Sequence, residues 1–310
     1  MPAITLPASN SIRARLMRWT TSRLVAPIFR SGHTPAVERR KLEQISRLSQ
    51  LMVPRGTQRT QRPLGGLPTE WVENRHAGVQ GHLLYFHGGA FVIGSPATHC
   101  NFTIHLAKHC ALRVASVDYR LAPEHPFPAA TDDVLKAYRA LLDEGVPAKQ
   151  IIVAGDSAGG GLVMACAIAI RDAGLPQPAG LVCVSPWVDL TLSGDSMTQQ
   201  RETEIILTRD ALAEAASFYL NGTFAKQPLA SPLFADLRGL PPLLIQVTDA
   251  EILYNDSTRL AEAAERQGVP VQLEVSPGLW HDWQLFAGQM PEADHALERI
   301  AAFVKQRLAA

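Results

Sequence analysis

Apolar residues recur along the chain with two different periods. Short apolar runs of four or five residues predict buried strands, and longer segments with apolar residues three or four positions apart predict helices. The predicted strands are His82–Phe86, Arg113–Val117, Ile151–Ala154, Gly180–Val184, Leu243–Val247 and Val271–Val275. The predicted helices lie near Ala97–Cys110, Ala129–Glu144, Ala158–Arg171 and Asp256–Gln267, with a last amphipathic helix that carries Leu297, Ile300, Val304 and Leu308. This alternation predicts an α/β fold with a mainly parallel central sheet flanked by helices.

Composition narrows the classes of protein that this pattern allows. A chain of 310 residues with 46% hydrophobic content can bury a large core. Basic and acidic residues balance at 29 each, so no net field would attract nucleic acid or an acidic membrane surface, and a small neutral ligand fits better. The four cysteines have no metal-ligand spacing and are expected to be reduced. No apolar run approaches the ~20 residues that span a bilayer, and no signal peptide is recognisable, so we expect no stable membrane insertion and a cytoplasmic location.

The sharpest local signal is Gly155-Asp156-Ser157-Ala158-Gly159, which joins a predicted strand directly to a predicted helix. A serine on such a turn projects its hydroxyl above the end of the sheet, where a base can reach it. The alternative is an ordinary tight turn. Glycine on both flanks of Ser157 favours a strained nucleophile elbow, because a packed turn needs small residues on one side only.

A second glycine motif follows the predicted strand His82–Phe86 and reads His87-Gly88-Gly89-Ala90. Glycines let backbone N–H groups approach a ligand closely. Together with the N–H of Ala158, this loop matches the oxyanion-hole arrangement of lipases and esterases. His87 itself is interpreted as an anchor of the loop.

These motifs resemble those of bacterial carboxylesterases of the hormone-sensitive lipase family, in the α/β-hydrolase superfamily. The resemblance spans about residues 80–290 and rests on His87-Gly88-Gly89, the run 118–130, Gly155–Gly160, Ser185-Pro186-Trp187 and His281. It implies an α/β-hydrolase fold, no metal or organic cofactor, and an oxyanion hole at Gly88, Gly89 and Ala158. Ala90 replaces a frequent third glycine of the family, which keeps the N–H and adds only a methyl group.

The resemblance also implies a base and an acid for Ser157. His281 follows the last predicted strand, as the histidine does in this fold, although Asp282 and Trp283 stand where the family usually has glycine and an aromatic residue. The other histidines are weaker candidates, and His105 and His109 are interpreted as ordinary helix residues.

The acid is less sharply defined, because three carboxylates lie in the segment 248–256 after the strand Leu243–Val247. The family usually has aspartate-proline-leucine here. Aligning its leucine with Leu253 puts Glu251 in the acid position, 30 residues before His281. Glutamate can perform the role, which is to fix the imidazole tautomer and stabilise the imidazolium. Asp249 remains the alternative.

Two segments break the strand–helix rhythm, residues 1–60 and 191–232. Neither is expected to add a strand, and we predict that they meet as a helical cap over the catalytic face, with 61–190 and 233–310 forming the catalytic domain. The stretch Ser11–Arg30 is basic and amphipathic; a membrane-surface helix would look similar, but we expect its apolar side to pack on the protein. Phe91, Trp187 and Trp283 are candidates for lining the substrate pocket.

The sequence therefore predicts a carboxylesterase for short to medium acyl esters that works through a covalent acyl-enzyme. An amidase or lactone hydrolase is the alternative enzyme. A non-catalytic small-molecule receptor on the same fold is the alternative outside catalysis, but the presence of His281 argues against it. A homodimer is considered as an assembly.

Overall fold

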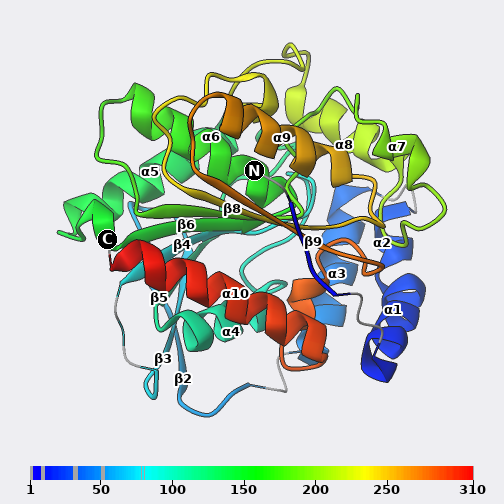
Figure 1. Ribbon diagram of the computed structural model, residues 1–310, viewed down its shortest axis with the longest axis horizontal. Coiled ribbons are helices and arrows are strands. Elements are labelled where there is room, and N and C mark those ends of the chain that lie inside the picture. Colours follow the sequence, from blue (N-terminus) through cyan, green and yellow to red (C-terminus); the bar gives the residue numbers. More distant parts are fainter. Residues whose placement is uncertain are drawn as a thin grey trace.

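The computed structural model describes residues 3–7, 11–30, 34–49, 53–77, 79 and 81–309. Within them, the strands form a nine-stranded sheet in the order β1-β9-β8-β7-β6-β4-β5-β3-β2 (Figure 1). The strands are β1 (Ile4–Thr5), β2 (Thr57–Gln61), β3 (Thr69–Asn74), β4 (His82–Phe86), β5 (Arg113–Val117), β6 (Ile151–Asp156), β7 (Gly180–Val184), β8 (Leu243–Thr248) and β9 (Val271–Ser276).

The six strands predicted from apolar runs, β4 to β9, are confirmed, and all neighbouring pairs among them are parallel. The apolar runs of β4 to β8 are nearly continuous because both faces of the sheet are buried there, whereas β9 reads Val-Gln-Leu-Glu-Val-Ser and its first three residues are half-buried. In β4, Leu84 and Phe86 belong to the core on one face, and Leu83 and Tyr85 belong to the core on the other. Because these strands are parallel, their carboxyl ends lie at the same edge of the sheet, where the loops that follow them can build a site.

The expectation that the first 60 residues add no strand is wrong. β1 pairs in parallel with β9, and β2 pairs with β3, which runs antiparallel to β5. β2 reads Thr-Gln-Arg-Thr-Gln and lies at the sheet edge, so no apolar pattern marks it. The side chain of Arg59 in β2 pairs with Glu70 of β3 at 2.7 Å, a cross-strand contact that hydrophobic periodicity does not reveal.

Helices cover both faces of the sheet. Figure 1 shows α5, α6 and α9 on one face and α4 and α10 on the other. The helices are α1 (Ile12–Leu24), α2 (Ala26–Arg30), α3 (Pro35–Ser49), α4 (Cys100–Cys110), α5 (Ala129–Asp143), α6 (Ala158–Asp172), α7 (Ser196–Gln199), α8 (Arg209–Leu220), α9 (Tyr254–Arg266) and α10 (Pro291–Leu308), with 3-10 turns η1 (Ala148–Gln150), η2 (Pro232–Phe234) and η3 (Trp283–Phe286). In the described part of the chain, no helix combines the length and apolar character that crossing a bilayer requires.

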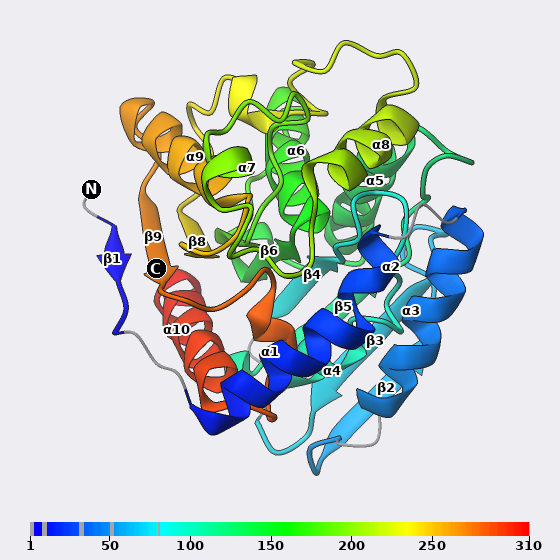
Figure 2. The same ribbon diagram turned by 90° about the vertical axis from the view of Figure 1, so that its right-hand side faces the viewer.

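The helices α1, α2, α3, α7 and α8 gather on one side of the molecule (Figure 2). Arginines tie the N-terminal helices to the segment that carries α7 and α8: Arg18 donates to the carbonyl of Thr203 at 2.9 Å and Arg30 to that of Ile206 at 3.2 Å. Arg39 of α3 donates to the carbonyl of Val92 at 2.8 Å. The two segments that break the strand rhythm are therefore in direct contact.

The stretch Ser11–Arg30 forms two helices, α1 and α2. The prediction that its apolar side packs on the protein is only partly confirmed. Ile28 is buried and Met17 packs against the core, whereas Leu16, Trp19 and Leu24 are each more than half exposed.

Candidate active site

Ser157 stands at the turn between β6 and α6. Its φ of 51° and ψ of −119° are rare for a residue with a side chain, which is the backbone strain expected of a nucleophile elbow. A Cβ on Gly155 would lie 2.5 Å from the carbonyl oxygen of Gly159, and a Cβ on Gly159 would lie 2.0 Å from that of Phe86. Both flanking glycines are therefore required by the close crossing of strand and helix.

His281 lies in the loop between β9 and η3 and is held by a buried carboxylate. Its Nδ1 is 3.0 Å from Oε1 of Glu251, which follows β8 and is fully buried. The other oxygen of Glu251 accepts hydrogen bonds from the hydroxyl of Ser185 at 2.8 Å and the N–H of Thr248 at 3.4 Å. Glu251 is thereby fixed in an orientation that favours a proton on Nδ1 of His281, and Nε2 lies on the far side of the ring.

Asp249, the alternative acid, has a different contact. Its Oδ1 accepts the N–H of Gly278 at 2.8 Å and so connects the loop after β8 to the loop that carries His281. Glu251 is therefore in contact with His281, whereas Asp249 holds the loop that precedes His281.

Asp282 adds a second carboxylate to His281. Its backbone is in the left-handed region with φ of 57°, and its Oδ2 lies 3.0 Å from Nε2 of His281. Burial lowers the pKa of His281, but the charges of Asp282 and Glu251 outweigh it and hold that pKa well above its ordinary value. Burial also raises the pKa of the Asp282 carboxyl. Sequence reasoning noted Asp282 as a departure from the family pattern but gave it no role.

The loop after β4 presents backbone N–H groups beside Ser157. Gly88 donates its N–H to Oδ2 of Asp156 at 3.1 Å, which counts against its predicted role as an oxyanion donor. Among the described residues, the N–H groups of Gly89, Ala90 and Ala158 have no hydrogen-bond acceptor. Gly89 and Ala90 both line the cavity that Ser157 lines. The free donors are thus one residue further along the loop than expected, because the Asp156 side chain occupies the first.

The side chain of Asp156 connects this loop to neighbouring elements. Tyr85 donates its hydroxyl to Oδ1 of Asp156, and Nε2 of His99 lies 3.2 Å from Oδ2. His87 stacks on Tyr119 with ring centroids 4.3 Å apart, and burial lowers the pKa of His87 to about 3. A ring that stays neutral and stacked fits the predicted anchoring role of His87. The motif contains Asp156, yet its contacts with Tyr85 and His99 depend on residues far away in the chain.

A cavity of about 310 Å³ joins Ser157 to His281. Most of its walls are apolar and come from the N-terminal helices, α4, the segment before and within α8, and η3. The apolar lining residues are Val25, Phe29, Leu42, Ile45, Phe102, Ile206, Leu207, Leu212, Leu285 and Phe286.

The three aromatic residues predicted to line the pocket do not line it. Phe91, with φ of 64°, is buried in the core, where its ring stacks on Tyr219 with centroids 3.9 Å apart. Trp187 is fully buried and donates its indole N–H to the carbonyl of Asp189 at 3.2 Å. Trp283 is 1% exposed and lies outside the cavity lining. The prediction was based on their position in the sequence beside the motifs. Their side chains point into the core and not into the cavity.

A second, larger cavity of about 1000 Å³ meets the first at Phe29, Gly89, Ala90, Leu207 and Leu212. Its lining includes charged side chains of both signs, namely Arg30, Glu38, Arg201, Glu202, Arg209, Asp210 and Glu214. Buried Glu204 supports this region: its carboxylate accepts the N–H groups of Ile206 at 2.7 Å and Ile252 at 3.2 Å. Glu204 thereby joins the segment before α8 to the loop of Glu251, a connection that the sequence did not indicate.

The sheet order and the strand–elbow–helix unit define the class of the protein as an α/β-hydrolase. A family model described as the alpha/beta hydrolase fold matches residues 83–285. The chain is 44% identical to an acetyl-hydrolase of Streptomyces hygroscopicus over 78% of this chain and 81% of that protein. It is 39% identical to an esterase of Acinetobacter venetianus over 77% of this chain and 79% of that protein.

Solved structures agree with these relatives. A crystal structure of an esterase from the bacterial hormone-sensitive lipase family is similar with a TM-score of 0.91 and 37% identity, covering 97% of this chain and 99% of that one. The crystal structure of EstE5 soaked with p-nitrophenyl butyrate has a TM-score of 0.91 and 36% identity, covering 97% of this chain and all of that one. The chain belongs to the bacterial hormone-sensitive lipase family of carboxylesterases and is a carboxylic ester hydrolase.

Proposed function

We propose that the protein hydrolyses esters of short to medium acyl groups with Ser157 as nucleophile, His281 as general base and Glu251 as the acid that orients it. The observation that carries this proposal is a single cavity lined by Ser157 and by a histidine whose Nδ1 is 3.0 Å from a buried carboxylate. Glu251 is preferred to Asp249 because, of these two carboxylates, Glu251 contacts the imidazole and Asp249 accepts the N–H of Gly278.

Each chemical step then has a protein group. His281 takes the proton from the Ser157 hydroxyl as its oxygen attacks the ester carbonyl, and Glu251 stabilises the imidazolium that forms. The N–H groups of Gly89, Ala90 and Ala158 hold the oxyanion. His281 returns the proton to the departing alcohol, which leaves an acyl-enzyme on Ser157. The same histidine then activates a water molecule that releases the acid.

The carboxylate of Asp282 must move away from Nε2 of His281 during this cycle. Nε2 of His281 faces its carboxylate at 3.0 Å, and the same nitrogen has to accept the Ser157 proton. Hydrogen bonds of catalytic groups are often misaligned without substrate and tighten in the Michaelis complex. We therefore assign Asp282 as a positioning residue that holds Nε2 until substrate binds.

The cavity walls support the choice of acyl group. The cavity beside Ser157 measures about 310 Å³ and is mostly apolar, so it suits a short or medium alkyl chain. We assign the alcohol group to the larger second cavity, whose charged lining favours polar alcohols. The N-terminal residues 1–60 and the segment 191–232 form the cap in this proposal, because α2, α3 and α8 supply walls of both cavities.

The test is a hydrolysis series of p-nitrophenyl esters from acetyl to palmitoyl with wild type and Ser157→Ala. We expect maximal kcat/KM at short to medium chains, and complete loss of turnover and of fluorophosphonate labelling in Ser157→Ala with an unchanged melting temperature. Maximal turnover at long chains would refute the acyl assignment, and labelling of the alanine variant would remove Ser157 from the mechanism.

The proposal includes a cytoplasmic location and a homodimer. The four cysteines, all in the described part of the chain, are buried free thiols, which suits a reducing compartment. At that edge of the sheet the outermost strand is the two-residue β1, which presents few unpaired backbone groups, so the homodimer rests on the resemblance to family members that pair through their last strand and helix. Light scattering coupled to size exclusion measures the assembly, and a monomer at micromolar concentration would refute it.

A further inference from the structure

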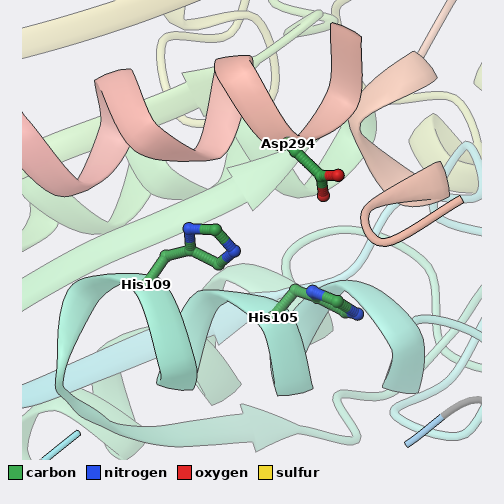
Figure 3. A group of neighbouring side chains, drawn as sticks. All are labelled: His105, His109 and Asp294. Carbon is green, nitrogen blue, oxygen red and sulfur yellow. The ribbon is translucent and has the colours of Figure 1, made fainter. Parts of the chain in front are cut away.

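Three side chains outside the proposed active site meet between α4 and α10. His105 and His109 lie one turn apart on α4, and Asp294 lies in the first turn of α10. Figure 3 shows the three side chains in the gap between the two helices. One donor atom of each residue lies within 4.8 Å of the others, and no other group of His, Cys, Asp or Glu in the described residues does so.

The local packing leaves donor atoms of this cluster without a partner. Nδ1 of His105 is buried and has no hydrogen-bond partner within the part of the chain that the structure describes. A buried polar atom without a partner is costly, and this imidazole nitrogen lies in the cluster with its lone pair free to bind a metal ion. Asp294 uses Oδ1 to accept the N–H of Gly288 at 2.6 Å, which orients the carboxylate and leaves its second oxygen for another contact.

The surroundings hold the imidazole of His105 in place. A Cβ on Gly288 would lie 2.6 Å from Cε1 of His105, so the loop packs against the ring with no room for a side chain at this position. Asn101, one turn earlier on α4, donates to the carbonyls of Leu285 at 2.9 Å and Ala287 at 3.0 Å. The Gly288 loop and α4 are therefore fixed to each other, which limits the cost of ordering a ligand set.

We propose that His105, His109 and Asp294 form a Zn²⁺ site that links α4 to α10, with water completing a tetrahedral shell. Zn²⁺ takes nitrogen and carboxylate oxygen at ~2.0–2.2 Å, which sets donor atoms ~3.4 Å apart. The observed separations of up to 4.8 Å exceed this by at most about 1.4 Å, which rotation of the His109 and Asp294 side chains closes while His105 stays in place. The proposed role is structural. The ion would hold α10 against α4 on the face of the sheet that both helices cover, independently of ester hydrolysis.

The experiment uses full-length protein dialysed against a chelator and then titrated with ZnCl₂ by isothermal calorimetry, with thermal melts in parallel. We expect one Zn²⁺ per chain and a melting temperature raised by about 5 °C at a hundredfold excess over Kd, whereas MgCl₂ gives no shift. Asp294→Asn and His109→Gln should each abolish the calorimetric signal and the shift. His295→Gln is the matched control, an exposed neighbour of Asp294, and should retain both.

Three results would overturn the proposal. They are the absence of Zn²⁺ binding to wild type, binding that persists at one equivalent in both Asp294→Asn and His109→Gln, and binding lost equally in His295→Gln. If His109→Gln fails to fold, Asp294→Asn decides the matter, because a partly exposed carboxylate replaced by its amide keeps the shape of the side chain.

Discussion

The choice of acid gives the most discriminating prediction. In Glu251→Gln the side chain keeps its volume but loses its charge and presents an amide to the imidazole. If the amide N–H faces Nδ1 of His281, the ring takes the tautomer with its proton on Nε2, which cannot accept the Ser157 proton. We expect kcat to fall and KM to change little, because the contact acts on the transition state.

The structure sets the magnitude of this loss. Glu251 is fully buried, and its carboxylate is 3.0 Å from His281 Nδ1. Two unit charges about 4 Å apart attract by ~4 kcal/mol at an effective dielectric constant of ~20, which corresponds to roughly a thousandfold in rate. The wrong tautomer adds to this, so we expect kcat/KM to fall by about 10³–10⁴.

The assay is hydrolysis of p-nitrophenyl butyrate by Glu251→Gln, with folding checked by thermal melts. Asp249→Asn is the matched control: it alters a carboxylate two residues away that binds Gly278, and its kcat/KM should stay within about tenfold of wild type. The reverse order, with the control variant more impaired than Glu251→Gln, would refute the reasoning.

Three further predictions address the pH profile, the elbow and the core. His281 must be neutral to act as a base, and Asp282 raises its pKa, so Asp282→Asn should move the low-pH limit of kcat/KM to lower pH; a profile that stays in place contradicts this. Gly159→Ala places a methyl 2.0 Å from a carbonyl oxygen and should prevent folding, whereas Gly268→Ala, which meets open space and carries only the cost of a left-handed φ of 76°, should lose about 1–2 kcal/mol in urea unfolding. Trp187→Phe should lower the melting temperature and leave the dependence of kcat/KM on acyl length unchanged. A shifted dependence would show that Trp187 does contact the acyl chain.

Hydrophobic patterning located the centre of the sheet but not its edges. The strands β4 to β8 are buried on both faces, so their apolar runs are visible in the sequence, and β9 shows apolar residues at alternate positions. β2 consists of polar residues and depends on pairing with β3, and β1 has only two residues. Such strands exist because a neighbouring strand offers hydrogen bonds, which is information that no local pattern contains.

The sequence by itself determined the nucleophile elbow around Ser157, the glycine loop that begins at Gly88, and the histidine expected to act as base. These features are local, because each depends on backbone conformation within a few residues. Only the tertiary structure decided that Glu251 rather than Asp249 contacts His281, that Asp156 occupies the N–H of Gly88, and that neighbouring aromatic side chains point into the core. Those outcomes depend on side-chain direction and on contacts between residues distant in the chain, and both are set only when the helices and the sheet pack together.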